Sequence, residues 1–132
     1  MTIAAGSVGI VAIDSQMRWA WVSDEAAELN GIPAHEHIRQ RVRDLLPDMG
    51  EELEASLTQA MHGETIRGTI RGPNIAGESA DWCYEHLPGH ETLHIGAIAV
   101  FWRGGGDPYE SPLVNETIRY ARAYLYARWL KG

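Results

Sequence analysis

The sequence has 132 residues, of which 45% are hydrophobic and 22% charged, with a formal net charge of −7. This length suits one domain with one core, and the acidic balance argues against the basic face that direct nucleic-acid binding requires. No stretch approaches the ~20 apolar residues of a membrane span, and no basic residue precedes the first apolar run as in an export signal, so we expect a cytoplasmic location without membrane contact.

The first third of the chain predicts a β-hairpin and a short helix. Residues 8–14 and 17–22 are short apolar runs separated by turn-forming residues. Ser23 or Asp24 suits a helix N-cap, and Asn30-Gly31 ends that helix.

Two amphipathic segments follow. Residues 35–46 place apolar side chains at the spacing of one helical face, and Pro47 closes the segment. Residues 51–61 repeat that spacing and predict the longest central helix.

The second half predicts a β-meander with strands at 65–71, 80–87 and 93–102 and a turn at 88–91. Alternation places Trp82, Tyr84 and His86 on one face of their strand. A turn centred near residue 90 would bring His86 opposite His94.

The C-terminal part predicts a separate helix. We expect a domain at 1–103, a glycine-rich linker at 104–110 and an amphipathic helix at 111–132. Its apolar stripe needs a surface to pack on, either the sheet or the same helix of a second subunit, so we expect a homodimer.

The element order and three local phrases resemble the PAS domain family over roughly residues 8–102. The phrases are SDEAAELNGIP at 23–33 with RVRDLLP at 41–47, MHGE at 61–64, and IGAI at 95–98. Ser23 and Gln40 depart from the asparagine and glycine that are common in the family. FWRGGG at 101–106 stands in place of the family's link to an output helix. The resemblance implies an α+β fold: a five-stranded antiparallel sheet flanked by short helices and one long helix, with the C-terminal amphipathic helix added.

The resemblance also implies a function. It indicates a bacterial sensory domain of signal transduction that is not an enzyme and binds a small apolar ligand or a signalling protein. We expect the ligand between the central helices and the sheet, in contact with Leu57, Met61, Trp82, Tyr84, His86, His94, Ile98 and Val100.

The sequence leaves the cofactor unknown. Light-sensing relatives attach flavin to a cysteine, and residues 35–47 contain none, so only a non-covalent flavin stays open. Cys83, the single cysteine, lies on a predicted strand and away from the aromatic face. Haem-binding relatives use a histidine of the long helix. The candidate here, His62, lies at the helix end, where it complements the helix dipole, which disfavours haem.

No metal site is predicted. The His35-Glu36-His37 run lacks the spacing of a zinc-binding helix and is expected to face solvent. His86 and His94 would be fewer ligands than zinc takes from a protein.

Two alternatives stay open. One is a small cone-shaped α+β enzyme of the isomerase or dehydratase kind, with Asp81, Tyr84, Glu85 and His86 as acid and base. The other is a ligand-free dimerisation scaffold. A chain that opens with a hairpin, where the cone fold opens with a long helix, favours the PAS-like interpretation.

Overall fold

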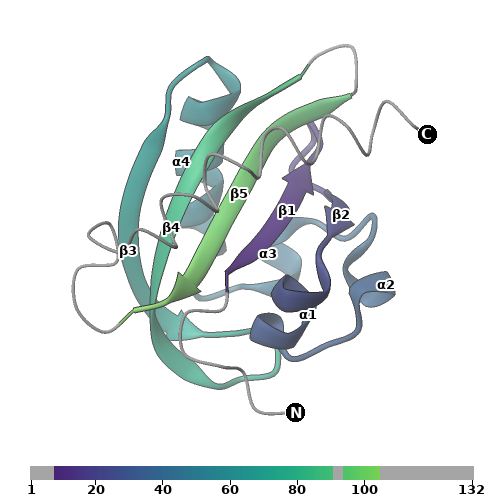
Figure 1. Ribbon diagram of the computed structural model, residues 1–132, viewed down its shortest axis with the longest axis vertical. Helices are drawn as coiled ribbons and strands as arrows, with labels where there is room; N and C mark the ends of the chain where they lie inside the picture. The colour runs from purple at the N-terminus through teal and green to yellow at the C-terminus, as the bar shows by residue number, and fades with distance from the viewer. Residues whose placement is uncertain (1–7, 91–93, 105–132) are drawn as a thin grey trace.

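One antiparallel sheet organises the part of the chain that the computed structural model describes, residues 8–90 and 94–104. Its strand order is β2-β1-β5-β4-β3 (Figure 1). The strands are β1 (Gly9–Ile13), β2 (Trp19–Val22), β3 (Ile66–Pro73), β4 (Ser79–His90) and β5 (Ile95–Arg103). The predicted antiparallel sheet is thereby confirmed.

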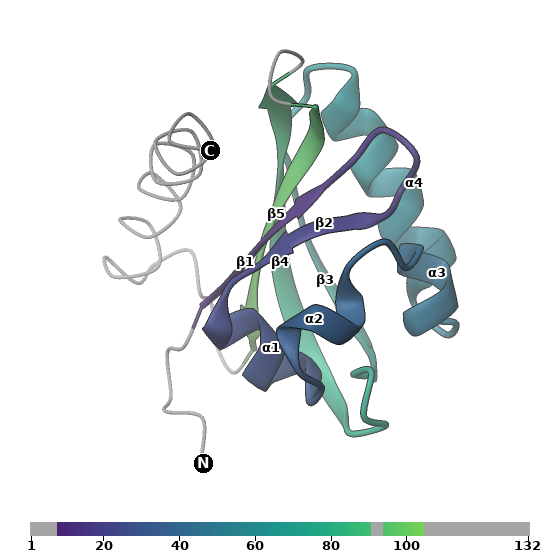
Figure 2. The same cartoon turned by 90° about the vertical axis from the view of Figure 1, so that its right-hand side faces the viewer.

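Four helices cover one face of this sheet, called here the inner face (Figure 2). They are α1 (Asp24–Asn30), α2 (Ala34–His37), α3 (Val42–Leu45) and α4 (Gly50–Met61), and α4 is the longest of them, as predicted. The α+β class is confirmed. Of the predicted linker at 104–110 only Gly104 is described, and the predicted helix at 111–132 lies outside the described residues. No helix in the described ranges is long and apolar enough to span a bilayer.

The ends of α1 follow the predicted capping chemistry. Ser23 is the N-cap: its Oγ accepts hydrogen bonds from the backbone N–H of Ala26 at 3.2 Å and of Ile10 at 3.0 Å. Gly31 ends the helix in the left-handed region with φ 81°, and a Cβ there would lie 2.5 Å from that of Ala76. Ser23 therefore fixes both the start of α1 and its place beside β1.

The predicted single helix over 35–46 is wrong. The structure has two one-turn helices, α2 and α3, joined by a segment at 38–41 that is extended at Ile38 and Arg41 and turns at Arg39 with φ 69°. This segment pairs with the edge strand β2: Trp19 N–H donates to the carbonyl of Gln40 at 2.9 Å, and Arg39 N–H donates to that of Trp19 at 2.9 Å. Pairing the exposed edge of β2 satisfies backbone groups that a continuous helix would leave open.

The predicted turn at 88–91 is also wrong. β4 continues through Pro88 and ends at His90, with Pro88 paired with Ala97 and His90 with Ile95. His86 therefore lies opposite Ala99 and not opposite His94.

Apolar side chains fill both faces of the sheet. The inner face packs against the helices through a cluster that includes Val11, Trp19, Leu29, Leu57 and Trp82. The other face, called here the outer face, carries a second buried cluster: Val8, Ala12, Cys83, Leu87, Ile95, Ile98, Val100 and Trp102. The central strands β4 and β5 are thus buried on both sides.

Candidate functional site

A cavity of about 60 Å³ lies between the helices and the inner face of the sheet. Its wall is mainly apolar and aromatic, and none of the described residues that line it carries a carboxylate, an ammonium or a guanidinium group. The lining residues are Val11, Ile13, Trp19, Asn30, Val42, Leu46, Met49, Leu53, Leu57, Ile70, Asn74, Trp82, Tyr84, His86, Ala99 and Phe101.

Four of the eight predicted contact residues line this cavity: Leu57, Trp82, Tyr84 and His86. Met61 and His94 instead line a separate, more open hollow beside the β1–β2 turn, and His94 is exposed with φ 58°.

Ile98 and Val100 lie on the outer face, so their predicted orientation was off by one residue. Their neighbour Ala99 lines the cavity in their place. The physical reason is that β5 is apolar on both faces, so its sequence carries no alternation that fixes which residues face inward.

His86 makes a short polar contact at the cavity. Its Nδ1 lies 2.7 Å from Oγ of Ser56 in α4, and its ring stacks on Tyr84 with centroids 4.4 Å apart. Burial lowers the pKa of His86 to about 3. The ring is therefore neutral at physiological pH.

A second polar pair lies where α1 meets α2. His37 is completely buried, although its run was expected to face solvent. Its Nδ1–H donates to the carbonyl of Pro33 at 3.1 Å, because a carbonyl can only accept, and Nε2 accepts from the Asn30 amide at 3.1 Å. Burial also lowers the pKa of His37.

Trp19 contributes an unpaired donor beside this pair. Its ring meets that of His37 edge to face, 5.0 Å between centroids, and lines the cavity. The buried indole Nε1 has no hydrogen-bond partner. An unpaired buried donor costs stability, and such atoms are few in native proteins.

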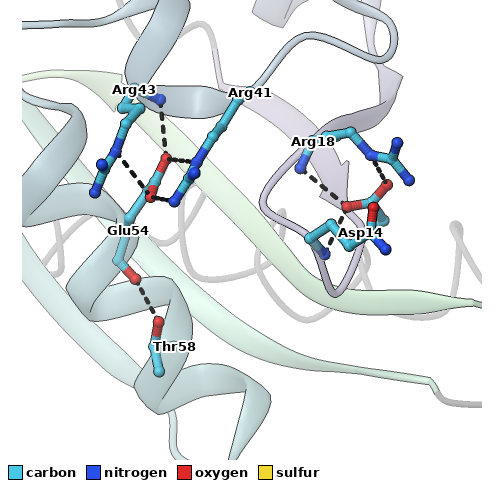
Figure 3. A network of polar contacts seen from close by, with 7 residues as sticks. Asp14, Arg18, Arg41, Arg43, Glu54 and Thr58 are labelled. Carbon is cyan, nitrogen blue, oxygen red and sulfur yellow. Dashed lines mark hydrogen bonds and ion pairs between the residues drawn. The ribbon is translucent and has the colours of Figure 1, made fainter.

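Glu54 fixes the wall that α3 and α4 form (Figure 3). Its side chain is 7% exposed and accepts hydrogen bonds from the Arg41 guanidinium at 2.9 and 3.2 Å and from the backbone N–H of Arg43 at 3.0 Å. Burial raises the pKa of Glu54, but these donors outweigh it, so the net pKa is lowered. Figure 3 also shows the separate pair of Asp14 with Arg18, which closes the β1–β2 turn.

The cavity is too small for flavin or haem, the two cofactors considered from the resemblance to the PAS family. Binding pockets for drug-sized ligands measure about 300–1,000 Å³, far above the volume here, so neither a flavin ring system nor haem fits. His62, the candidate haem ligand, is exposed at the C-cap of α4 and is not among the lining residues. Within the described ranges no group of three or more His, Cys, Asp or Glu side chains could hold a metal ion.

The acid and base residues of the alternative enzyme reading are divided between the two faces of β4. Tyr84 and His86 face the cavity. Asp81 and Glu85 form ion pairs with Arg71 and Arg67 of β3. The four residues therefore do not meet in one site.

Sequence reasoning missed Trp19, Asn30, Ser56 and Ala99. In the sequence, Asn30 marks only the end of a helix, and Ser56 lies between apolar residues of α4 without any motif around it. One signal in the sequence could have identified Ser56. It directly precedes the predicted core residue Leu57, which places it on the buried side of α4.

Comparison with known proteins identifies the class. A family model of the PAS fold matches residues 4–100, so the chain belongs to the PAS family, whose members are sensory domains of signal transduction. No protein of curated function matches the sequence.

Solved structures share this fold at low identity. The PAS domain of a protein from Colwellia psychrerythraea is 20% identical, with TM-score 0.62 over 77% of this chain and 90% of that chain. A domain of a sensory box sensor histidine kinase/response regulator from Geobacter sulfurreducens is 16% identical, with TM-score 0.60 over 77% and 87%. The PAS domain of a LuxR-family transcriptional regulator from Burkholderia thailandensis, in complex with ethanol, is 12% identical, with TM-score 0.57 over 76% and 92%.

Proposed function

We propose that this PAS domain is a non-catalytic cytoplasmic sensor that holds a small neutral ligand in the cavity on the inner face of its sheet. The cavity itself carries this proposal. Its volume of about 60 Å³ exceeds the roughly 10–15 Å³ that one water occupies and is less than half of the about 150 Å³ of a cavity that accepts benzene. A ligand of a few heavy atoms is therefore the right size, and ethanol in the similar Burkholderia domain is a ligand of that kind.

The signal would leave through the outer face. The apolar cluster there is buried, and no described helix lies against it (Figure 2). We propose that residues 111–132 form the amphipathic helix that packs on this face and joins two copies of the chain in a homodimer. A signalling protein that contacts this dimer would read the occupancy of the cavity.

Filling the cavity tests the sensor. Ala99→Leu adds three carbon atoms at a lining residue, and Ile98→Val is the matched control on the outer face of the same strand. The measurement is gas chromatography with mass spectrometry of the molecules released when freshly purified protein is unfolded. We expect a stoichiometric small molecule from the wild type and the Ile98→Val control and none from Ala99→Leu. Equal release from both variants, or none from the wild type, would contradict the proposal and favour a ligand-free scaffold.

A further inference from the structure

His86 has one nitrogen without a partner at the cavity. The side chain is 2% exposed and lines the cavity, and Nδ1 is occupied by Ser56. No group of the described residues hydrogen-bonds to Nε2. Both nitrogens of an imidazole form hydrogen bonds, and one left unpaired inside a protein costs stability. A ligand that supplies the missing bond at Nε2 removes that cost.

The surroundings of His86 favour a neutral ligand. None of the described lining residues is charged, and the pKa of about 3 keeps the ring neutral. A carboxylate or an ammonium group would lose its hydration in this cavity without meeting an opposite charge. Ionic ligands are therefore disfavoured even where their size fits.

The bond to Ser56 narrows the chemistry further. If the Ser56 hydroxyl donates to Nδ1, then Nε2 carries the proton and needs an acceptor. If Nδ1 carries the proton and donates to Ser56, then Nε2 needs a donor. A hydroxyl group both donates and accepts, so it satisfies Nε2 in either tautomer. An ether or an alkene does not.

We infer that the cavity takes a small neutral alcohol whose hydroxyl group hydrogen-bonds to Nε2 of His86 and whose alkyl part packs against Leu57 and Ala99. Both apolar side chains are close to His86: Ala99 is its cross-strand neighbour on β5, and Leu57 follows Ser56 on α4. The inference rests on the proposed ligand-binding function and names the anchor and the ligand class within it.

The test compares three probes of similar length in NMR titrations of the full ¹⁵N-labelled chain. Ethanol carries the hydroxyl, chloroethane has chlorine in its place, and acetate is the anion. One hydrogen bond contributes about a fivefold difference in affinity, so we expect ethanol to bind about five times more tightly than chloroethane. Acetate should leave the amide signals of the cavity residues unchanged.

Two variants test which residue forms the hydrogen bond to the ligand. His86→Phe keeps a flat ring that can stack on Tyr84 but removes Nε2, so it should bind both uncharged probes equally. Trp19→Phe removes the other unpaired nitrogen that lines the cavity. If that variant, and not His86→Phe, loses the preference for ethanol, Trp19 is the anchor and the inference is overturned.

An NMR signal of the wild type tests the same hydrogen bond without depending on whether a variant folds. The ¹⁵N resonance of His86 Nε2 should shift with ethanol and stay in place with chloroethane. If the two probes bind equally and no such shift occurs, the inference of an alcohol ligand is overturned. The proposal that the cavity binds a small neutral ligand is then still supported. Failure of both uncharged probes to perturb the cavity of the wild type overturns the sensor proposal as well.

Discussion

The hydroxyl of Ser56 and Nδ1 of His86 lie 2.7 Å apart and join the longest described helix to the middle of strand β4. Both residues are buried, and they are separated by 30 positions in the sequence. This hydrogen bond connects α4 to the sheet at the cavity. We therefore expect its removal to lower the free energy of unfolding.

Ser56→Ala should lower the free energy of unfolding by about 1–3 kcal/mol, because Nδ1 of the buried His86 is left without a partner. The matched control is Thr58→Ala on the exposed side of the same helix, where the hydroxyl bonds only to the carbonyl of Glu54 at 2.8 Å. That control should change stability by less than about 0.5 kcal/mol. Urea unfolding of both variants measures these changes. Equal losses in the free energy of unfolding would show that the Ser56–His86 hydrogen bond adds no stability of its own.

Stability should fall as the pH drops below about 6.5, the usual pKa of histidine. Burial lowers the pKa of His86 to about 3. Between pH 6.5 and pH 3 the histidine is therefore protonated in the unfolded chain but neutral in the folded protein. His37 shifts in the same direction. Stability is therefore full above pH 6.5 and declines toward pH 3, by up to about 1.4 kcal/mol per pH unit for one histidine.

The pH range of 6.5 to 5 isolates this effect. The pKa of Glu54 is lowered from an ordinary value of 4.5, so its contribution is lost only below that range. Urea midpoints of the wild type should fall across the range more steeply than those of His86→Phe. Parallel curves would mean that His86 is protonated in the folded protein.

Glu54→Gln should destabilise the protein by about 2 kcal/mol. The amide keeps the shape of the side chain but loses the charge that faces Arg41 and Arg43, and hydrogen bonds to charged groups contribute about 1.5–3 kcal/mol. Glu51→Gln, an exposed residue of the same helix, is the control and should be nearly neutral. Thermal unfolding compares the two, and an equal shift in Tm would show that the Glu54 network contributes nothing to stability.

The proposed homodimer predicts that a chain ending at Gly106 is monomeric, because the residues expected to join the two copies are removed. Sedimentation velocity of the short and full chains at matched concentration measures this. A short chain that still sediments as a dimer would place the main contact elsewhere.

Much of the fold could be predicted from the sequence because local chemistry was consistent with it. Ser23 and Gly31 carry capping signals, and residues 51–61 have a clear helical period. Prediction failed where tertiary pairing overrode a local signal. Residues 38–41 pair with β2 although their apolar spacing suited a helix, and Pro88 continues a strand although Pro-Gly favours a turn.

The candidate site was half predictable. The alternation of Trp82, Tyr84 and His86 identified the inner face of β4 correctly. The same reasoning failed on β5, because a strand that is apolar on both faces shows no period. The contact of Ser56 with His86 depends on how α4 crosses the sheet, which no spacing in the sequence records.

The double burial of β4 sets how far a signal of the proposed sensor would have to travel. Tyr84 and His86 face the cavity, while Cys83 and Leu87 belong to the outer cluster, so adjacent residues of one strand belong to both sides. In the proposed sensor, a ligand that shifts His86 would also displace Leu87 on the outer face, because the two residues are adjacent on one strand. The signal would then cross only the thickness of one backbone, without a relay through loops or helices.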